Sequence, residues 1–334
     1  MGLDELYAEA EAKREHSDPA SAAASFDRVV ELDSEGSFAP KALFQAAESH
    51  DLAGKPAEAQ ARYDRLVRTF PKHPLARVAL VRNVRLSTYL DRWPRAGELG
   101  ELLLTRYQDL RPLEKIVAYS GKAFEMVAKE RDDLALRYVD KARDLIETDG
   151  LDRAGRLSPD VAAVYFALGE ARRMRAERIH FSDEPRRLPE LLEQRCQLLL
   201  DAQSAYSDSM RAYDAHWSTM AGYRVGELYQ SLHRDLMQVP APRTADTDER
   251  RQLFEGAMRL RYSVLLSKAR AMIEHTLSMA ERTGEQTSWV LKAKQAKESI
   301  ERDIQREEQT LAALPYTRRQ LETALRTLGK TGPR

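Results

Sequence analysis

The stretch Pro40–Pro71, PKALFQAAESHDLAGKPAEAQARYDRLVRTFP, contains two helical patterns joined by a short turn. Gly54 suits the left-handed turn that ends the first helix, and Pro56 suits the opening of the second. Residues at helical spacing share one face in each pattern: Leu43, Ala46, Ala47 and His50 in the first, and Ala59, Tyr63 and Leu66 in the second. A single hairpin of this size cannot bury its own apolar face, so further copies are expected.

Copies occur 37 residues before and after this hairpin. Five framework positions keep their size class, with Gly100 as the exception: Leu6/Leu43/Leu80, Ala10/Ala47/Val84, Ala22/Ala59/Ala96, Phe26/Tyr63/Gly100 and Val29/Leu66/Leu103. A fourth copy lies 39 residues further on, with Tyr119, Ala123, Ala135, Val139 and Ala142. The recurrence predicts stacked hairpins that share one continuous interior.

This order of large, small, small, aromatic and apolar residues resembles the tetratricopeptide repeat (TPR) across residues 3–145. The copies are about three residues longer than the usual repeat of about 34, which places the extra residues in loops. The resemblance implies an all-α fold of the TPR-type α-solenoid class, a right-handed superhelix of helical hairpins.

The remainder of the chain predicts longer helices. Two domains are expected, with four regular TPR-like hairpins in 1–148 and extended hairpins with C-terminal capping helices in 158–334. Helices are expected at 3–15, 19–33, 38–53, 56–70, 74–92, 94–107, 112–129, 132–148, 159–181, 189–213, 214–238, 247–283, 287–313 and from Thr317 to about 328.

Composition excludes several classes of protein. Charged residues make up 32% and aromatic residues 7% of the 334 residues, and 53 basic residues balance 53 acidic ones. Nothing in this balance favours nucleic acid or an anionic membrane surface as a partner. The single cysteine, Cys196, cannot form an intrachain disulfide, and no apolar run approaches the length of a membrane span. The N-terminal sequence MGLDELYAEAEAK is acidic and is not a signal peptide.

A search for catalytic chemistry finds no motif. No two histidines have the spacing of a helical metal site, and HExxH, CxxC, GxSxG and a phosphate loop are absent, so no metal or cofactor is expected. Four arginines follow one helix, at 172, 173, 175 and 178. They fit a salt-bridged face or a site for an acidic partner, and an enzyme built on them is the least favoured reading.

The remaining candidate site is the concave face, which the first helix of each TPR hairpin lines. Aromatic side chains there alternate with charged ones, which suits binding of a peptide or helix. The alternative is that the aromatic residues pack against the next hairpin or the long C-terminal helices. The predicted partner-binding residues are Tyr7, Phe44, Gln45, Glu48, Val81, Arg82, Arg85, Phe124, Phe166, Glu170, Tyr223, Arg224 and Glu227, with Glu11 beside Tyr7.

Four runs in residues 165–290 resemble a C-terminal region of TPR proteins from gliding and predatory proteobacteria: LGEARRMRAERI, LLLDAQSAYSDSM, AGYRVGELYQSLHRDLMQVPAP and LLSKARAMIEHTLSMAERTG. The resemblance implies a non-enzymatic assembly factor of an envelope machine such as adventurous gliding motility, with other envelope or motility subunits as partners. It implies the periplasm or cell envelope if a signal sequence has been removed, and otherwise the cytoplasm. The alternative is a cytoplasmic regulatory TPR module that senses a peptide or small ligand.

Overall fold

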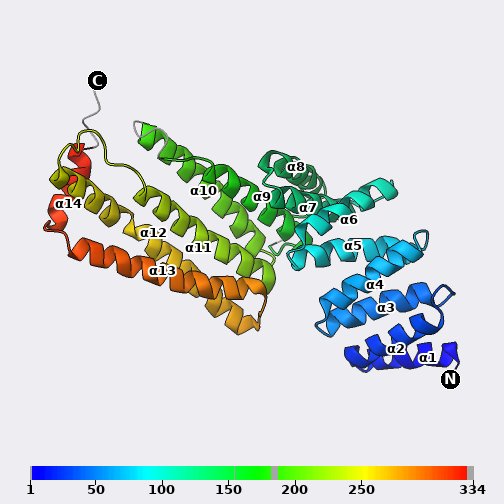
Figure 1. The fold of residues 1–334 in the computed structure, drawn as a ribbon. Coiled ribbons are helices and arrows are strands. Elements are labelled where there is room, and N and C mark those ends of the chain that lie inside the picture. The colour runs from blue at the N-terminus through cyan, green and yellow to red at the C-terminus, as the bar shows by residue number, and fades with distance from the viewer. Residues whose placement is uncertain (1, 154, 182–186, 329–334) are drawn as a thin grey trace. The chain divides into compact units, whose positions relative to one another are not determined.

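A computed structural model describes residues 2–153, 155–181 and 187–328, and all regular structure in these ranges is helical (Figure 1). The expected all-α fold is therefore confirmed. The chain divides into two compact units, residues 1–151 and 152–334. Across the described ranges, no helix combines the length and apolar character needed to span a membrane.

The first unit is a stack of four helical hairpins. Its helices are α1 (Leu3–Glu15), α2 (Pro19–Leu32), α3 (Ala39–Leu52), α4 (Pro56–Thr69), α5 (Pro74–Tyr89), α6 (Trp93–Arg106), α7 (Pro112–Ala128) and α8 (Asp132–Thr148). Each helix packs against the next one in the chain, and α5 also contacts α3 and α7. The odd-numbered helices α3, α5 and α7 therefore form one layer of the stack.

All four hairpins turn through one residue with a left-handed backbone. Ser17, Gly54, Asp91 and Glu130 have φ angles of 59°, 72°, 57° and 56°. Their spacings of 37, 37 and 39 residues (54 − 17, 91 − 54, 130 − 91) reproduce the period of the side-chain pattern. The amide after each turn residue donates to a carbonyl of the helix that ends there, as Lys55 N does to His50 O at 2.8 Å. The backbone thus repeats even where the turn residue is not glycine.

Small residues bring the helices of each hairpin together. Ala22, Ala59, Ala96 and Ala135 all have 0% exposure, so the equivalent positions of four hairpins have equivalent burial. Gly100 departs from the aromatic pattern because α6 and α7 approach closely there. A Cβ atom at Gly100 would lie 2.6 Å from the carbonyl oxygen of Ala118.

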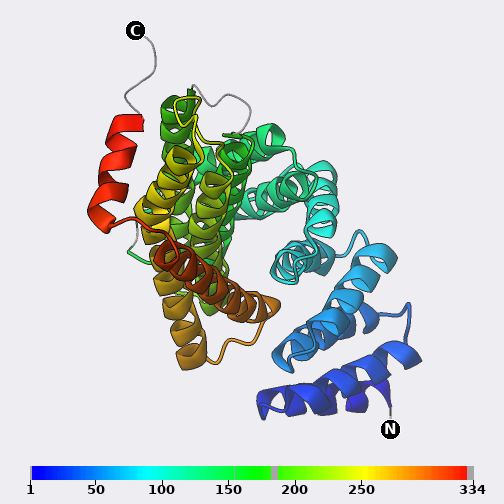
Figure 2. The same cartoon turned by 60° about the vertical axis from the view of Figure 1, so that its left-hand side comes forward.

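The second unit is built from longer helices. They are α9 (Pro159–Glu177), α10 (Leu188–Met210), α11 (Ala215–Met237), α12 (Asp248–Thr283), α13 (Ser288–Ala312) and α14 (Arg318–Leu328). Helix α11 contacts both α9 and α13, so these three helices lie in one layer. Figure 2 shows α14, in red, beside α12, with which it packs.

Helix α9 ends at Glu177, four residues before the expected end at 181. The chain leaves the helix there, and Phe181 becomes buried at 2% exposure. The guanidinium carbon of Arg195 lies 5.1 Å from the centroid of the Phe181 ring. Burial of this ring against a buried cation accounts for the early end of the helix.

We expect Gly100→Ala to lower the free energy of unfolding of the first unit by about 1–3 kcal/mol, because the new methyl group meets a backbone carbonyl that cannot rotate away. Thr105→Ala, at an exposed position of the same helix, is the control and should change it by no more than about 0.5 kcal/mol. Urea unfolding followed by circular dichroism measures both. Equal stability of the two variants would contradict the close approach of α6 and α7.

Candidate functional site

The layer of odd-numbered helices in the first unit carries a cluster of aromatic and charged side chains. The ring of Phe44 lies 5.7 Å from that of Tyr63, and the guanidinium of Arg82 lies over Phe44 at 5.2 Å. Arg82 also pairs with Glu48 at 2.8 Å. Phe44 is only 8% exposed, whereas the Arg82 side chain is 41% exposed. The cluster therefore presents a positioned cation to solvent and keeps its aromatic ring inside.

A hollow of about 320 Å³ lies next to this cluster, and we call it the α5–α7 hollow. Apolar and charged side chains share its lining: Val78, Val81, Arg82, Arg85, Arg111, Pro112, Leu113, Glu114, Asp149 and Leu151. Burial raises the pKa of Glu114, but hydrogen bonds from Arg77 and Arg111 outweigh it and lower the pKa to about 2. Glu114 is therefore ionised at neutral pH and holds the start of α7 against α5.

The other predicted residues of the first unit lie in or beside the layer. Tyr7 is half-buried, with its ring 5.6 Å from that of Phe26. Gln45 accepts a hydrogen bond from Arg14 at 3.0 Å. Phe124 is fully buried, and its ring lies 5.1 Å from that of Trp93. Phe124 therefore fits the alternative that aromatic residues of this face pack inside the fold, because none of its surface is exposed to a partner.

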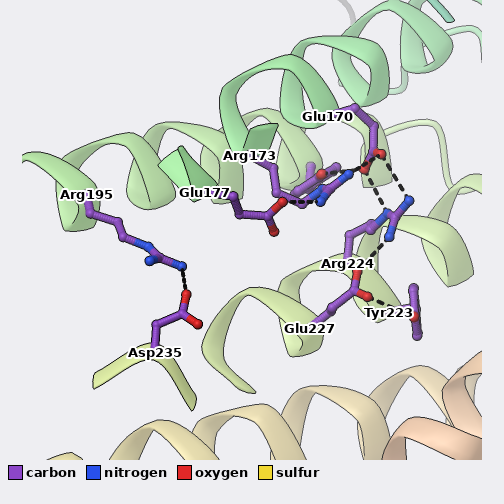
Figure 3. Close-up of polar contacts among 9 residues, drawn as sticks. Glu170, Arg173, Glu177, Arg195, Tyr223, Arg224, Glu227 and Asp235 are labelled. Atoms are coloured by element: carbon purple, nitrogen blue, oxygen red, sulfur yellow. Dashed lines mark hydrogen bonds and ion pairs between the residues drawn. The ribbon is translucent and has the colours of Figure 1, made fainter. Parts of the chain in front are cut away.

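The second unit contains a buried charge network centred on Glu170 of α9 (Figure 3). The Glu170 side chain is 0% exposed and accepts hydrogen bonds from Tyr206 at 2.6 Å, Arg173 at 3.1 Å and Arg224 at 3.0 Å. Burial raises the pKa of Glu170, but the charges of Arg224 and Arg173 outweigh it and lower the pKa. One carboxylate therefore joins α9, α10 and α11.

The arginines of this network extend to two further carboxylates. Arg173 donates to Glu177 at 2.6 Å, and Arg224 donates to Glu227 at 2.6 Å. Glu227 also accepts from the hydroxyl of Tyr223 at 3.1 Å. Burial together with Glu227 raises the pKa of Tyr223 to about 12, so the phenol is a donor at neutral pH. The network holds the carboxylates of Glu177 and Glu227 in fixed positions at the surface between α9 and α11.

A groove of about 620 Å³ runs along α11 between α9 and α13, and we call it the α9–α11–α13 groove. All its lining residues belong to the second unit, and most are polar: Arg173, Glu177, His180, Tyr223, Glu227, Gln230, Ser231, Arg234, Asp235, Lys292, Gln295, Ala296 and Ser299. Gln230 donates to Ser299 at 2.9 Å and thereby joins α11 to α13 across the floor. The groove therefore has a polar, hydrogen-bonded wall along three helices.

The structure separates the predicted residues of this unit into two sets. Tyr223 and Glu227 line the groove, whereas Phe166 and Glu170 are fully buried beneath it. Phe166 packs in a ring cluster with Tyr206 at 5.3 Å, Trp217 at 5.7 Å and Trp289 at 6.2 Å. Phe166 therefore fits the alternative that these aromatic residues pack against the long C-terminal helices. Direct contact with a partner is excluded by burial for Phe166 and Glu170 and stays a prediction for Tyr223, Arg224 and Glu227.

The four-arginine run does not form one face. Arg173 points to Glu170 and Glu177, and Arg172 donates to the carbonyl of Asp201 at 2.8 Å. Sequence reasoning missed the groove residues of α13, such as Lys292 and Ser299. The available signal was the alternation of helices along the chain, which places α13 two helices after α11 and so in the layer of α9 and α11. In the described ranges, no three His, Cys, Asp or Glu side chains are grouped to hold a metal ion.

No protein-family model and no curated protein matches this chain. Solved structures do match. A tetratricopeptide repeat protein from Parabacteroides merdae has 12% identity and a TM-score of 0.46, covering 90% of this chain and 98% of its own. The TPR-like repeats named for a Podosopora anserina kinesin light chain have 17% identity and a TM-score of 0.40, covering 60% and 96%. The TPR domain of P58(IPK) has 12% identity and a TM-score of 0.29, covering 98% and 97%. At these TM-scores none of the three carries an argument beyond the stacked helical hairpins that the structure itself shows.

We expect Glu170→Gln to destabilise the second unit by about 3–5 kcal/mol, because it leaves Arg173 and Arg224 without their shared buried counter-charge. Glu177→Gln is the matched control. The Glu177 side chain is 33% exposed, so its loss should cost less than about 1 kcal/mol. Guanidinium unfolding at neutral pH measures both values, and equal costs would show that the Glu170 pair is no stronger than a surface ion pair.

Proposed function

We propose that this chain is a non-catalytic protein-interaction scaffold that binds an extended peptide segment in the α9–α11–α13 groove. One observation carries the proposal: residues from α9, α11 and α13, with His180 just after α9, line a single groove of about 620 Å³. The buried network under it fixes charged groups of the wall before any partner arrives, which reduces the entropy lost on binding. Side-chain amides and hydroxyls along the floor suit hydrogen bonds to a peptide main chain.

The state of the groove carboxylates favours binding over catalysis. Glu177 accepts from Arg173, Glu227 accepts from Arg224, and Asp235 accepts from Arg195. A general acid or base must be free to reach the proton that it transfers, whereas each of these carboxylates is held by a guanidinium group of the same unit. These groups are therefore suited to shape and charge recognition.

A groove-filling substitution tests the docking site. Ser231→Trp places an indole in the groove, and Ser207→Trp places the same group at an exposed position of α10 outside it. Random peptides displayed on phage are selected on the unmodified protein. We expect the selected peptides to bind Ser231→Trp at least about tenfold more weakly and Ser207→Trp equally well, since filling a pocket excludes its ligand.

Failure to select any peptide that distinguishes the two tryptophan variants would contradict docking in this groove. Circular dichroism and urea unfolding of both variants check that each remains folded. A peptide that both variants bind with unchanged affinity would place the docking site elsewhere on the chain.

We also propose that the natural partners are subunits of an envelope-associated machine such as that of adventurous gliding motility, with the chain acting in the periplasm or at the cell envelope. The support is the likeness of the four quoted runs. These runs fall in the second unit, and parts of two of them form the α9 and α11 walls of the groove.

Affinity capture from the source cells tests this assignment together with the first unit. We expect defined envelope or motility proteins, with at least one recovered more weakly by the Arg82→Glu, Arg85→Glu double variant, because both arginines line the α5–α7 hollow. Arg68→Glu, at an exposed position of α4, is the control for added negative charge. Capture that is the same for all three proteins would contradict a role for this hollow, and capture of no envelope protein would contradict the assignment.

A further inference from the structure

The α9–α11–α13 groove has a cation at each end. At one end, the Nζ atom of Lys292 lies 3.6 Å from the centroid of the Trp289 ring, which is 5.5 Å from the ring of Tyr223. Arg234 lies eleven residues after Tyr223 on α11, which places it roughly 16 Å further along the helix axis. Both cations line the groove.

His180 adds a donor at the Arg234 end. Arg195 contacts both the ring of Phe181, which follows His180, and the carboxylate of Asp235, which follows Arg234. These shared contacts place the end of α9 beside the end of α11. His180 and Arg234 both line the groove and both are exposed.

The acceptors and donors of the groove differ in what they already bind. Every carboxylate of the lining accepts from an arginine of the same unit. By contrast, within residues 2–153, 155–181 and 187–328, neither Arg234 nor His180 has a hydrogen bond or an ion pair. Arg234 and His180 are therefore the donors of the groove that are open to a new acceptor, and a carboxylate that binds at this end breaks no existing pair.

Resting on the docking function proposed above, we infer that the α9–α11–α13 groove binds an extended acidic peptide, with one carboxylate at Lys292 and a second at Arg234. Acidic side chains four residues apart point to the same side of an extended chain, at about 13 Å from one another. This spacing is a few ångströms shorter than the roughly 16 Å along α11, and the long side chains of Lys292 and Arg234 span the difference. The amides and hydroxyls of Gln230, Gln295 and Ser231 bind the main chain between the two carboxylates.

Three synthetic peptides of matched length test the inference by calorimetric titration at low ionic strength. The first, Gly-Asp-Ser-Ala-Ser-Asp-Gly, has its acids four residues apart. The second replaces both acids with Asn, and the third, Gly-Asp-Asp-Ser-Ala-Ser-Gly, has the same composition with adjacent acids. We expect the first to bind at least about fivefold more tightly than either of the others, and its affinity to fall as salt is raised.

Charge reversal at one end locates the contact. Arg234→Glu should weaken the first peptide about tenfold and leave the Asn peptide unchanged, because only a carboxylate senses the new charge. Arg270→Glu is the control at an exposed position of α12 that does not line the groove. Equal weakening by both variants would show a long-range charge effect and would overturn the inference.

The outcomes separate this inference from the docking function. Two results would overturn the acidic preference and leave the docking function intact. One is that phage-selected peptides need an unfilled groove but contain no paired acids. The other is equal affinity for the Asp and Asn peptides. Equal affinity for the two Asp peptides would overturn the two-ended contact. Absence of any peptide that senses Ser231→Trp would remove the docking function and this inference together.

Discussion

Close approach of helix backbones at small residues is the constraint on which both units depend. A hairpin of two short helices has too little apolar surface to stay folded alone, so its stability comes from the neighbour on each side. Ala22, Ala59 and Ala96 have no exposed surface, and Gly100 allows α6 to touch the carbonyl of Ala118. The core is packed between neighbouring helices. Residues on the other side of the odd-numbered helices can therefore line hollows without removing apolar side chains from the core.

The second unit places charge where a repeat stack ordinarily places apolar side chains. Glu170 and its two arginines connect α9 with α11, and Tyr206 brings in α10. A buried ion network costs desolvation energy that well-packed apolar residues would not, so it is weak evidence for a role in stability alone. Its geometric effect is definite: Arg173 and Arg224 hold Glu177 and Glu227 in the wall of the groove.

Sequence periodicity was enough to predict the hairpins because small and apolar residues recur wherever helices cross. Even the left-handed turn residues follow that period, although Asp91 and Glu130 give no glycine signal. Periodicity predicts which side of a helix faces inward but not how deep a residue lies. The pattern therefore leaves both contact with a partner and packing open for Phe124 and Phe166, and it places Glu170 on the concave face. In the structure the rings of Trp93 and Trp289 contact the two phenylalanines, and two arginines bind Glu170. The groove residues of α13 were missed for a related reason, because a wall made of three helices depends on contacts distant in sequence.

Helix α12 has 36 residues, so it is about 54 Å long and reaches across several neighbours. Near its start, Ala257 packs with Leu321 and Ala324 of α14. Further along, Ala269 and Ile273 pack with Ile300 of α13 and the tyrosines of α11. A tensile load on α14 would therefore be carried along one continuous helix to the residues that pack against α11 and α13.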